Sequence, residues 1–164
     1  MLSSAVQPIS LGSWPTPVEP LARCAQALGL GPEDLWIKRD DVTGLGGGGN
    51  KIRKLQYTCA QALAVGATTL ITTGAPQSNH ARLTASAAAR LGLRCVLVLG
   101  GAEPESAQGN LVLDALAGAE IVWAGGDTAS ALDAAAQAVG RTQRNGAHHA
   151  VAQLLLHFQG QRAA

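Results

Sequence analysis

Short apolar runs alternate with helical segments along the middle of the chain, and this alternation constrains the fold more than any other feature. The runs "TTLITTGA", "RCVLVLGG" and "EIVWAGG" each close on a glycine turn and each precede a segment with helical character. Apolar runs of this length are typical of strands buried on both faces. Successive strand–helix units are joined by right-handed crossovers and give a parallel sheet covered on both sides. The sequence therefore predicts an α/β protein with three α/β/α layers and parallel strands near residues 68–73, 94–99 and 120–124.

Four helices are expected around these strands, over residues 50–64, 78–92, 110–119 and 127–140. Ser78 and Asp127 stand where a side-chain oxygen can accept a hydrogen bond from the first helical N–H groups, and Gly92 stands where helices commonly end. Nearer the N-terminus, "PVEPLARCAQAL" predicts a short helix and "DLWIKRDD" a strand.

The composition agrees with an α/β domain and excludes some partners. Aromatic residues make up only 3% of the chain, so small aliphatic residues must build the core, which suits close helix-on-sheet packing. A net charge of +1 gives no reason to expect nucleic acid or a membrane, and no apolar run approaches membrane-spanning length. Three scattered cysteines without a C-x-x-C motif, and an N-terminus unlike a signal peptide, predict a cytoplasmic protein.

The stretch "GLGGGGNKIRKLQY", residues 44–57, places Lys51 directly after a run of glycines and an asparagine. A phosphate-binding P-loop is excluded, because Asn50 separates the last glycine from the lysine and Ile52 stands where a hydroxyl is needed. A dinucleotide-binding pattern is matched only formally, since no acidic residue follows at about 20 positions. A flexible linker stays open as the structural alternative.

The turn "GAPQSNHAR" places Gln77, Ser78, Asn79 and His80 at the carboxyl end of a predicted strand. Ligands of parallel sheets bind at such ends, where helical N–H groups favour an anion. Ser78 acting only as a helix cap is the structural alternative. A cap accounts for one hydroxyl and leaves three other polar side chains unexplained.

Charge is unevenly distributed along the chain. No Asp or Glu occurs from Val42 to Ala102, although that segment contains six cations: Lys51, Arg53, Lys54, Arg82, Arg90 and Arg94. A local charge of +6 indicates an anionic ligand such as a phosphate or carboxylate. Among neighbouring cations, Lys51 is also placed for covalent work, because repulsion favours the neutral amine that attacks a carbonyl.

Three motifs together resemble one enzyme family. "WIKRDDVTGLGGGGNKIRKLQY", "TTLITTGAPQSNHAR" and "GNLVLDALAGAE" follow one another in the order found in the D-cysteine desulfhydrase and 1-aminocyclopropane-1-carboxylate deaminase family. The resemblance runs from about Leu11 to Val139. It implies pyridoxal 5'-phosphate as cofactor, a tryptophan synthase β-like fold, a small amino-acid substrate and a homodimer.

The resemblance also implies roles for single residues. Lys51 would bind the cofactor covalently and move the substrate α-proton, and Ser78 would be the nucleophile or acid–base group. Asn79 would hydrogen-bond the cofactor ring oxygen, and Asn50 and Lys54 would line the same pocket. The substrate carboxylate would be held by residues of the "QSNH" turn, namely Gln77, Ser78, Asn79 and His80.

The same turn bears on the choice of substrate. "QSNH" is the form typical of the desulfhydrases, whereas the deaminases tend to have Gln in place of His80. The expected reaction is therefore β-elimination of D-cysteine to pyruvate, sulfide and ammonia, with 1-aminocyclopropane-1-carboxylate deamination as the alternative.

The family's chains are about twice as long, and their second half holds the loop for the cofactor phosphate. We therefore expect residues 1–46 to belong with the family's large domain, residues 47–140 to form the small domain with the cofactor lysine, and residues 141–164 to be a divergent tail. The strand in "LWIKRD" should then lie outside the central sheet. A truncated chain without catalytic activity is the second hypothesis for function.

The tail "RTQRNGAHHAVAQLLLHFQGQRAA" does not have the strand expected next and reads instead as ending in an amphipathic helix. Its histidines at positions 148, 149 and 157 could suggest a metal site, but no Cys or acid accompanies them. No metal site is predicted.

Overall fold

The structure is a computed structural model that describes residues 6–142 and 150–153. Its central sheet has four strands in the order β5–β4–β3–β6, all parallel to their neighbours. The strands are β3 (Ala67–Gly74), β4 (Arg94–Leu99), β5 (Glu120–Trp123) and β6 (Ala150–Gln153). The three strands predicted from the sequence are confirmed.

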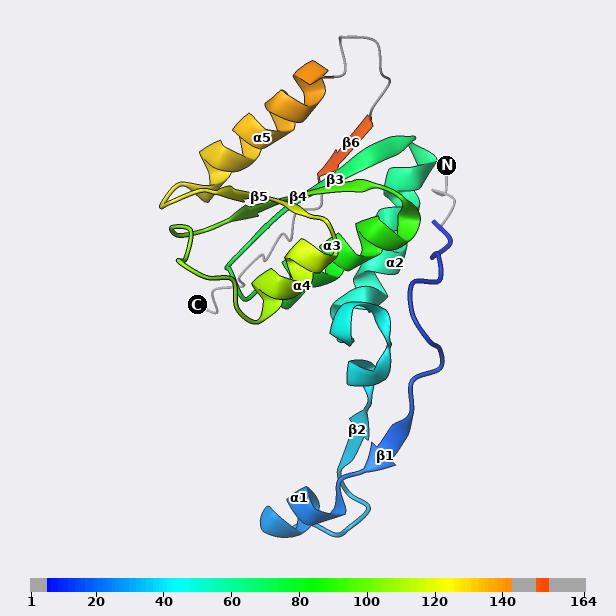
Figure 1. The fold of residues 1–164 in the computed structure, drawn as a ribbon. Helices are drawn as coiled ribbons and strands as arrows, with labels where there is room; N and C mark the ends of the chain where they lie inside the picture. The colour runs from blue at the N-terminus through cyan, green and yellow to red at the C-terminus, as the bar shows by residue number, and fades with distance from the viewer. Residues whose placement is uncertain (1–5, 143–149, 154–164) are drawn as a thin grey trace, which may run out of the picture.

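Helices cover both faces of this sheet (Figure 1). One face holds α2 (Lys51–Ala64), α3 (Asn79–Leu91) and α4 (Asn110–Leu116), and the other holds α5 (Thr128–Thr142). The predicted α/β/α layering is therefore confirmed.

The predicted helix caps are also confirmed. Ser78 Oγ accepts a hydrogen bond from the Ala81 N–H at 3.2 Å, and Asp127 Oδ1 accepts one from the Ser130 N–H at 3.0 Å. Gly92 ends α3 in the left-handed conformation. Local signals in the sequence therefore set the bounds of these helices.

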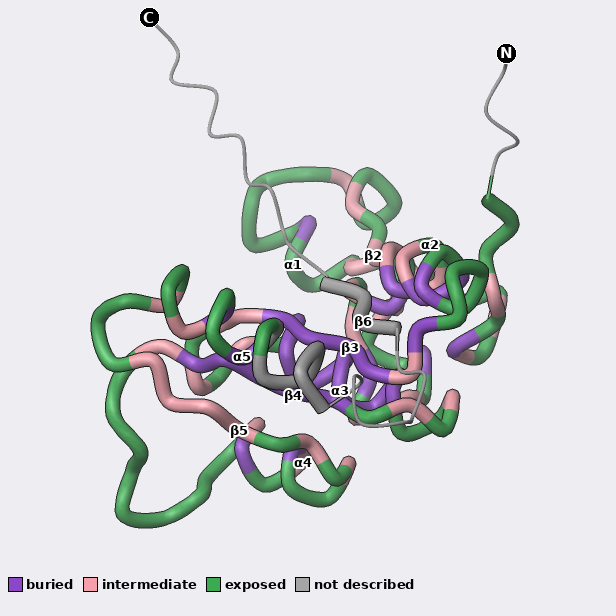
Figure 2. Tube along the Cα trace, turned by 90° about the horizontal axis from the view of Figure 1, so that it is seen from above, coloured by how far each residue is buried: buried purple, intermediate pink, exposed green. Residues whose placement is uncertain are grey.

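The core lies on both sides of β3 and β4. Leu70 and Leu97 point to the face of α2 and α3, whereas Ile71 and Val96 pack with α5. This alternation follows from the two-residue repeat of a strand. Helix α3 is buried continuously over residues 80–88, as Figure 2 shows, because it lies among the sheet, α2 and α4. Its many alanines allow that close approach.

A separate antiparallel pair of strands lies away from the central sheet (Figure 1). It consists of β1 (Val18–Pro20) and β2 (Trp36–Lys38), with α1 (Ala22–Ala27) between them. The "LWIKRD" strand was expected outside the central sheet, and this is confirmed. The helix expected over "PVEPLARCAQAL" is shorter than predicted, because its first residues pair with β2 as a strand.

The interpretation of the tail is wrong in one respect. Residues Ala150–Gln153 form β6 and pair with β3, although no strand was predicted there. Four residues are too few for a periodic pattern, so pairing with the edge of β3 decides their conformation. The predicted amphipathic helix lies outside the described residues. In the part of the chain that is described, no helix is long and apolar enough to cross a membrane.

Candidate functional site

Two helix starts and the loop before one of them form the candidate site. Helix α2 begins at Lys51, directly after residues 44–50, which we call the glycine loop. Helix α3 begins at Asn79, directly after the turn that follows β3. Helix α2 packs against α3, so the two helices and the loop form one unit.

The glycine loop is fixed by hydrogen bonds to the segment before it. The Gly49 N–H donates to the Asp40 carbonyl at 2.8 Å and to Thr43 Oγ1 at 3.1 Å. Thr43 is fully buried, and its hydroxyl donates in turn to the Asp40 carbonyl. The Gly48 N–H donates to the Leu45 carbonyl. These two loop N–H groups therefore have partners within the protein and do not form an anion-binding nest.

Close packing explains why the loop consists of glycine. Gly46 and Gly48 both have positive φ, at 55° and 75°. A Cβ at Gly46 would collide with the side chain of Ser86, and one at Gly48 would collide with the Asp41 carbonyl. The loop is thus a packed element of the fold, which argues against the flexible-linker interpretation.

Arg82 joins the glycine loop to the start of α3. Its guanidinium donates to the carbonyl oxygens of Gly46 and Gly48, the latter at 3.1 Å, and to Asn79 Oδ1 at 3.3 Å. Sequence reasoning counted Arg82 only as one of six cations. Its position one turn after Asn79, on the same helix face, was the signal that could have identified it.

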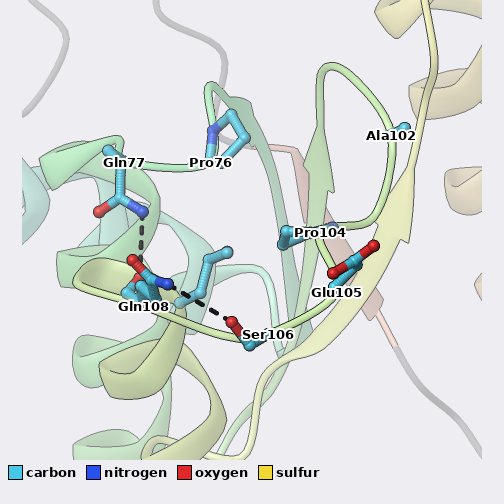
Figure 3. A pocket seen from close by; sticks show the side chains of 8 residues that line it. Pro76, Gln77, Ala102, Pro104, Glu105, Ser106 and Gln108 are labelled. Carbon is cyan, nitrogen blue, oxygen red and sulfur yellow. Dashed lines mark hydrogen bonds between the residues drawn. The ribbon is translucent and has the colours of Figure 1, made fainter.

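Asn110 joins the same network from the start of α4. Its Nδ2 donates to Asn79 Oδ1 at 3.1 Å and to the Gln77 carbonyl at 2.8 Å. The Asn110 N–H donates to Gln77 Oε1, and Gln77 Nε2 donates to the Gln108 carbonyl at 3.0 Å (Figure 3). The turn carrying Gln77 and Asn79 is therefore held from two sides. Asn110 was not identified from the sequence.

The two lysines of the first turn of α2 affect one another. Burial and, to a smaller extent, the nearby positive charge of Lys51 together lower the pKa of Lys54 from 10.5 to about 8. Lys51 itself is half-buried, and Asn50 is exposed at the N-cap position without a capping hydrogen bond from its side chain. Desolvation and like charge thus favour the neutral amine of Lys54.

The four polar residues of the "QSNH" turn are separated by the fold. Gln77 and Asn79 are exposed, and Ser78 is half-buried and caps α3. His80 is only 5% exposed, and its Nε2 lies 3.1 Å from Thr72 Oγ1 in β3. The imidazole therefore lies between α3 and the sheet, away from the exposed amides. The roles that the resemblance implies for Lys51, Ser78 and Asn79 in one site stay predictions.

The surplus of positive charge is partly used within the protein. Arg53 pairs with Asp40 at 2.6 Å, and Arg94 pairs with Glu120 at 3.4 Å. Arg82 is buried against the glycine loop. Half of the six cations thus have internal roles, so the charge pattern is weaker evidence for an anionic ligand than the sequence suggested. The described residues contain no cluster that could hold a metal ion, and the three tail histidines lie outside them.

A cavity of about 430 Å³ opens at the carboxyl edge of the sheet (Figure 3). The turn after β3 and the loop before α4 form its walls: Pro76, Gln77, Ala102, Pro104, Glu105, Ser106, Gln108 and Leu111. Of the predicted site residues, Gln77 alone is among them. The cavity therefore lies beside the polar network and not over Lys51.

Comparisons with known proteins agree on one family. A family model described as "Pyridoxal-phosphate dependent enzyme" matches residues 9–155. A "Putative 1-aminocyclopropane-1-carboxylate deaminase" of Pyrococcus abyssi is 51% identical over 112 residues, covering 68% of this chain and 32% of that protein. A D-cysteine desulfhydrase of Klebsiella pneumoniae is 52% identical over 104 residues, covering 60% of this chain and 31% of its own.

Solved structures extend the likeness to the fold. An ACC deaminase homologue matches with a TM-score of 0.76 and 39% identity, over 90% of this chain and 43% of that one. The apo form of Escherichia coli diaminopropionate ammonia lyase matches with a TM-score of 0.59 and 23% identity, which shows the fold alone. The chain spans about a third of the length of the curated relatives that it matches.

Proposed function

The chain belongs to the family of pyridoxal-phosphate dependent enzymes, and from that premise we propose that it is the lysine-bearing part of a D-cysteine desulfhydrase-type lyase. The observation that carries the proposal is the position of Lys51. It begins α2 directly after a packed glycine loop, and Arg82 ties that loop to Asn79. The reaction would convert D-cysteine to pyruvate, sulfide and ammonia.

The residues present fit the reactive end of the cofactor. Lys51 stands half-buried at a helix start, where its amine can attack a carbonyl. Lys51 and Asn79 would hold the cofactor, and Asn50 and Lys54 would lie beside it. When bound, pyridoxal phosphate supplies an electron sink for negative charge at the substrate α-carbon.

The residues of the chain would then act on the substrate. The Lys51 amine would remove the proton from the substrate α-carbon, because a lysine amine in its neutral form is a base. Ser78 would act as the nucleophile or acid–base group, and the exposed amides of Gln77 and Asn79 would hold the carboxylate. By resemblance His80 would also hold the carboxylate, although its Nε2 lies 3.1 Å from Thr72 Oγ1 in this structure.

Two other functions have support. Relatives bearing the deaminase and desulfhydrase names match at nearly equal identity, so 1-aminocyclopropane-1-carboxylate is the second candidate substrate. A catalytically silent fragment is the third candidate, because the Gly48 and Gly49 N–H groups are engaged internally and are not free to hold a phosphate. By resemblance we further propose a homodimer in the cytoplasm. The free state of Cys24, Cys59 and Cys95 supports a reducing compartment.

Reductive labelling tests the proposal. Purified chain is mixed with pyridoxal phosphate, reduced with borohydride, digested and examined by peptide mass spectrometry. We expect Lys51 to be modified before Lys38 or Lys54. Lys38 and Lys54 serve as internal controls, because they share solvent and reagent with Lys51. Equal modification of all three would show that Lys51 is an ordinary surface lysine.

A further inference from the structure

The long glycine run and the buried side chain of Arg82 fit one another. Arg82 is 6% exposed and lies against the glycine loop. A Cβ at Gly47 would lie 2.7 Å from Arg82 Nη1, so any larger residue there would displace the guanidinium. The glycines thus leave the space that Arg82 fills, and Arg82 bonds the carbonyls that they expose.

The hydrogen bonds of Arg82 link two parts of the candidate site. The guanidinium has five N–H donors in a rigid planar fork. Its Nη1 donates to the Gly46 carbonyl, and its Nη2 donates both to the Gly48 carbonyl and to Asn79 Oδ1. One side chain therefore fixes the loop that leads into Lys51 relative to the amide at the start of α3.

Arg82 is not held there by a carboxylate. In the described part of the chain, no acidic group lies within ion-pair distance of it. The charge of Arg82 acts on the buried Asp114 and lowers its pKa against the larger effect of burial, but neither carboxylate oxygen of Asp114 accepts a hydrogen bond from a described residue. Burying a guanidinium without a paired carboxylate costs free energy. The hydrogen bonds to Gly46, Gly48 and Asn79 therefore hold the buried charge in place of a paired carboxylate.

We propose that Arg82 is a positioning residue that sets the lysine-bearing end of the glycine loop, and with it Lys51, relative to Asn79. The inference rests on the proposed function, in which both residues hold the cofactor. Gly48 lies only three residues before Lys51, so a shift of its carbonyl moves the first turn of α2. Such a shift would displace the Lys51 amine. The rate of a reaction between two positioned groups falls steeply when one of them is displaced by a small distance.

The test compares Arg82→Met with Arg90→Met in the full chain. Arg90 lies in the last turn of the same helix and is exposed, which makes it a matched control. In the reductive labelling experiment, Arg82→Met should lower modification of Lys51 about tenfold relative to Lys38, and Arg90→Met should leave the ratio unchanged. Hydrogen exchange of residues 44–50 should quicken in Arg82→Met while exchange in β3 and β4 stays as in the wild type. If Arg82 only stabilised the fold, exchange in β3 and β4 would quicken together with exchange in residues 44–50.

Rescue gives an independent readout. Ethylguanidinium added to Arg82→Ala should restore part of the preferential labelling of Lys51, because it supplies the missing planar guanidinium group. A folded Arg82→Met protein with wild-type preference for Lys51 and unchanged exchange in the glycine loop would overturn the inference. If Arg82→Met does not fold, Arg82→Lys decides, since it keeps the charge but not the fork. Arg82→Lys should label Lys51 more slowly, and wild-type labelling would overturn the inference.

The same experiments distinguish failure of the proposed function from failure of the inference about Arg82. A wild-type chain without preference for Lys51 contradicts the role of Lys51 in cofactor binding and says nothing against the contacts of Arg82. In that case the hydrogen exchange of residues 44–50 alone tests whether Arg82 fixes the conformation of the glycine loop. Quickened exchange in Arg82→Met would support positioning, and unchanged exchange would overturn it.

Discussion

Arg82 Nη2 lies 3.1 Å from the carbonyl oxygen of Gly48, a residue 34 positions earlier in the chain. This contact joins the loop before the candidate lysine to helix α3, which begins at Asn79 and is capped by Ser78. It forms because the glycines leave room for a buried side chain, and because their carbonyls face it. The conformation of the loop is therefore part of the fold, and changes to it should be measurable as changes in stability.

Replacement of Gly48 by alanine should be far more damaging than replacement of Gly66. Both residues have positive φ, at 75° and 72°. An added Cβ at Gly66 meets nothing within 4 Å, whereas at Gly48 it collides with the Asp41 carbonyl. We expect a loss of unfolding free energy of about 1 kcal/mol for Gly66→Ala from backbone strain alone. Gly48→Ala should cost about 3 kcal/mol or more, because a collision adds to a φ, ψ region that nearly only glycine adopts.

Urea unfolding of the two variants and the wild type measures this difference. Gly66→Ala is the matched control, since it introduces the same methyl group at nearly the same φ. Equal losses in the two variants would mean that the glycine loop is not packed as described.

Lys54 should regain part of its basicity when Lys51 is removed. Its pKa is lowered from 10.5 to about 8, first by burial and then by the charge of Lys51. Lys51→Ala removes the like charge, which favours the charged form of Lys54 and raises its pKa. Burial remains, so the pKa should stay below 10.5. The pH dependence of Lys54 acetylation, followed by mass spectrometry, measures the shift, and Lys38→Ala should leave it unchanged.

Asp114 should make stability fall as the pH rises through the mildly acidic range. Burial raises its pKa from 3.8 to about 6, so the folded state holds a proton that the unfolded state has already released. The stabilisation is fully present below about pH 4 and is lost as the pH rises to about 6. Its upper limit is about 3 kcal/mol. Asp114→Asn should lack this pH-dependent loss.

Urea unfolding at pH 4, 5, 6 and 7 tests the behaviour of Asp114. Asp133→Asn is the control, because Asp133 is an exposed aspartate on α5. A wild-type and an Asp114→Asn profile that run parallel across this range would contradict the raised pKa.

Much of the fold could be predicted because its determinants are local. Apolar runs gave the strands β3, β4 and β5, and Ser78, Gly92 and Asp127 gave helix bounds. What could not be predicted depends on contacts between distant segments. Strand β6 forms by pairing with β3, and β1 forms by pairing with β2.

The candidate site shows the same division. Lys51 and Asn79 stand at helix starts that the sequence pattern marks. The burial of His80 against Thr72 and the bonds of Arg82 to the glycine loop depend on how α3 packs, which no short motif encodes. The roles of Lys51, Asn79 and His80 in binding and catalysis stay predictions.

The chain alone should bind pyridoxal phosphate weakly and catalyse negligibly. Lys51 and Asn79 can hold one end of the cofactor, but the N–H groups of Gly48 and Gly49 are already bonded to Leu45, Asp40 and Thr43. A phosphate dianion normally needs a nest of such groups. Without them the cofactor lies open to water, which weakens the electrostatic contacts that remain.

The measurement follows sulfide and pyruvate from D-cysteine, and ammonia from 1-aminocyclopropane-1-carboxylate, with pyridoxal phosphate added. Lys51→Ala is the control, because free pyridoxal phosphate catalyses some elimination without a protein. We expect wild type and control to differ little. The reason is that a single covalent anchor leaves the cofactor free to turn, so the Lys51 amine is seldom aligned with the substrate α-proton. Turnover of about 1 per second or more, abolished in Lys51→Ala, would contradict this expectation and show that these residues suffice for an ordinary enzyme rate.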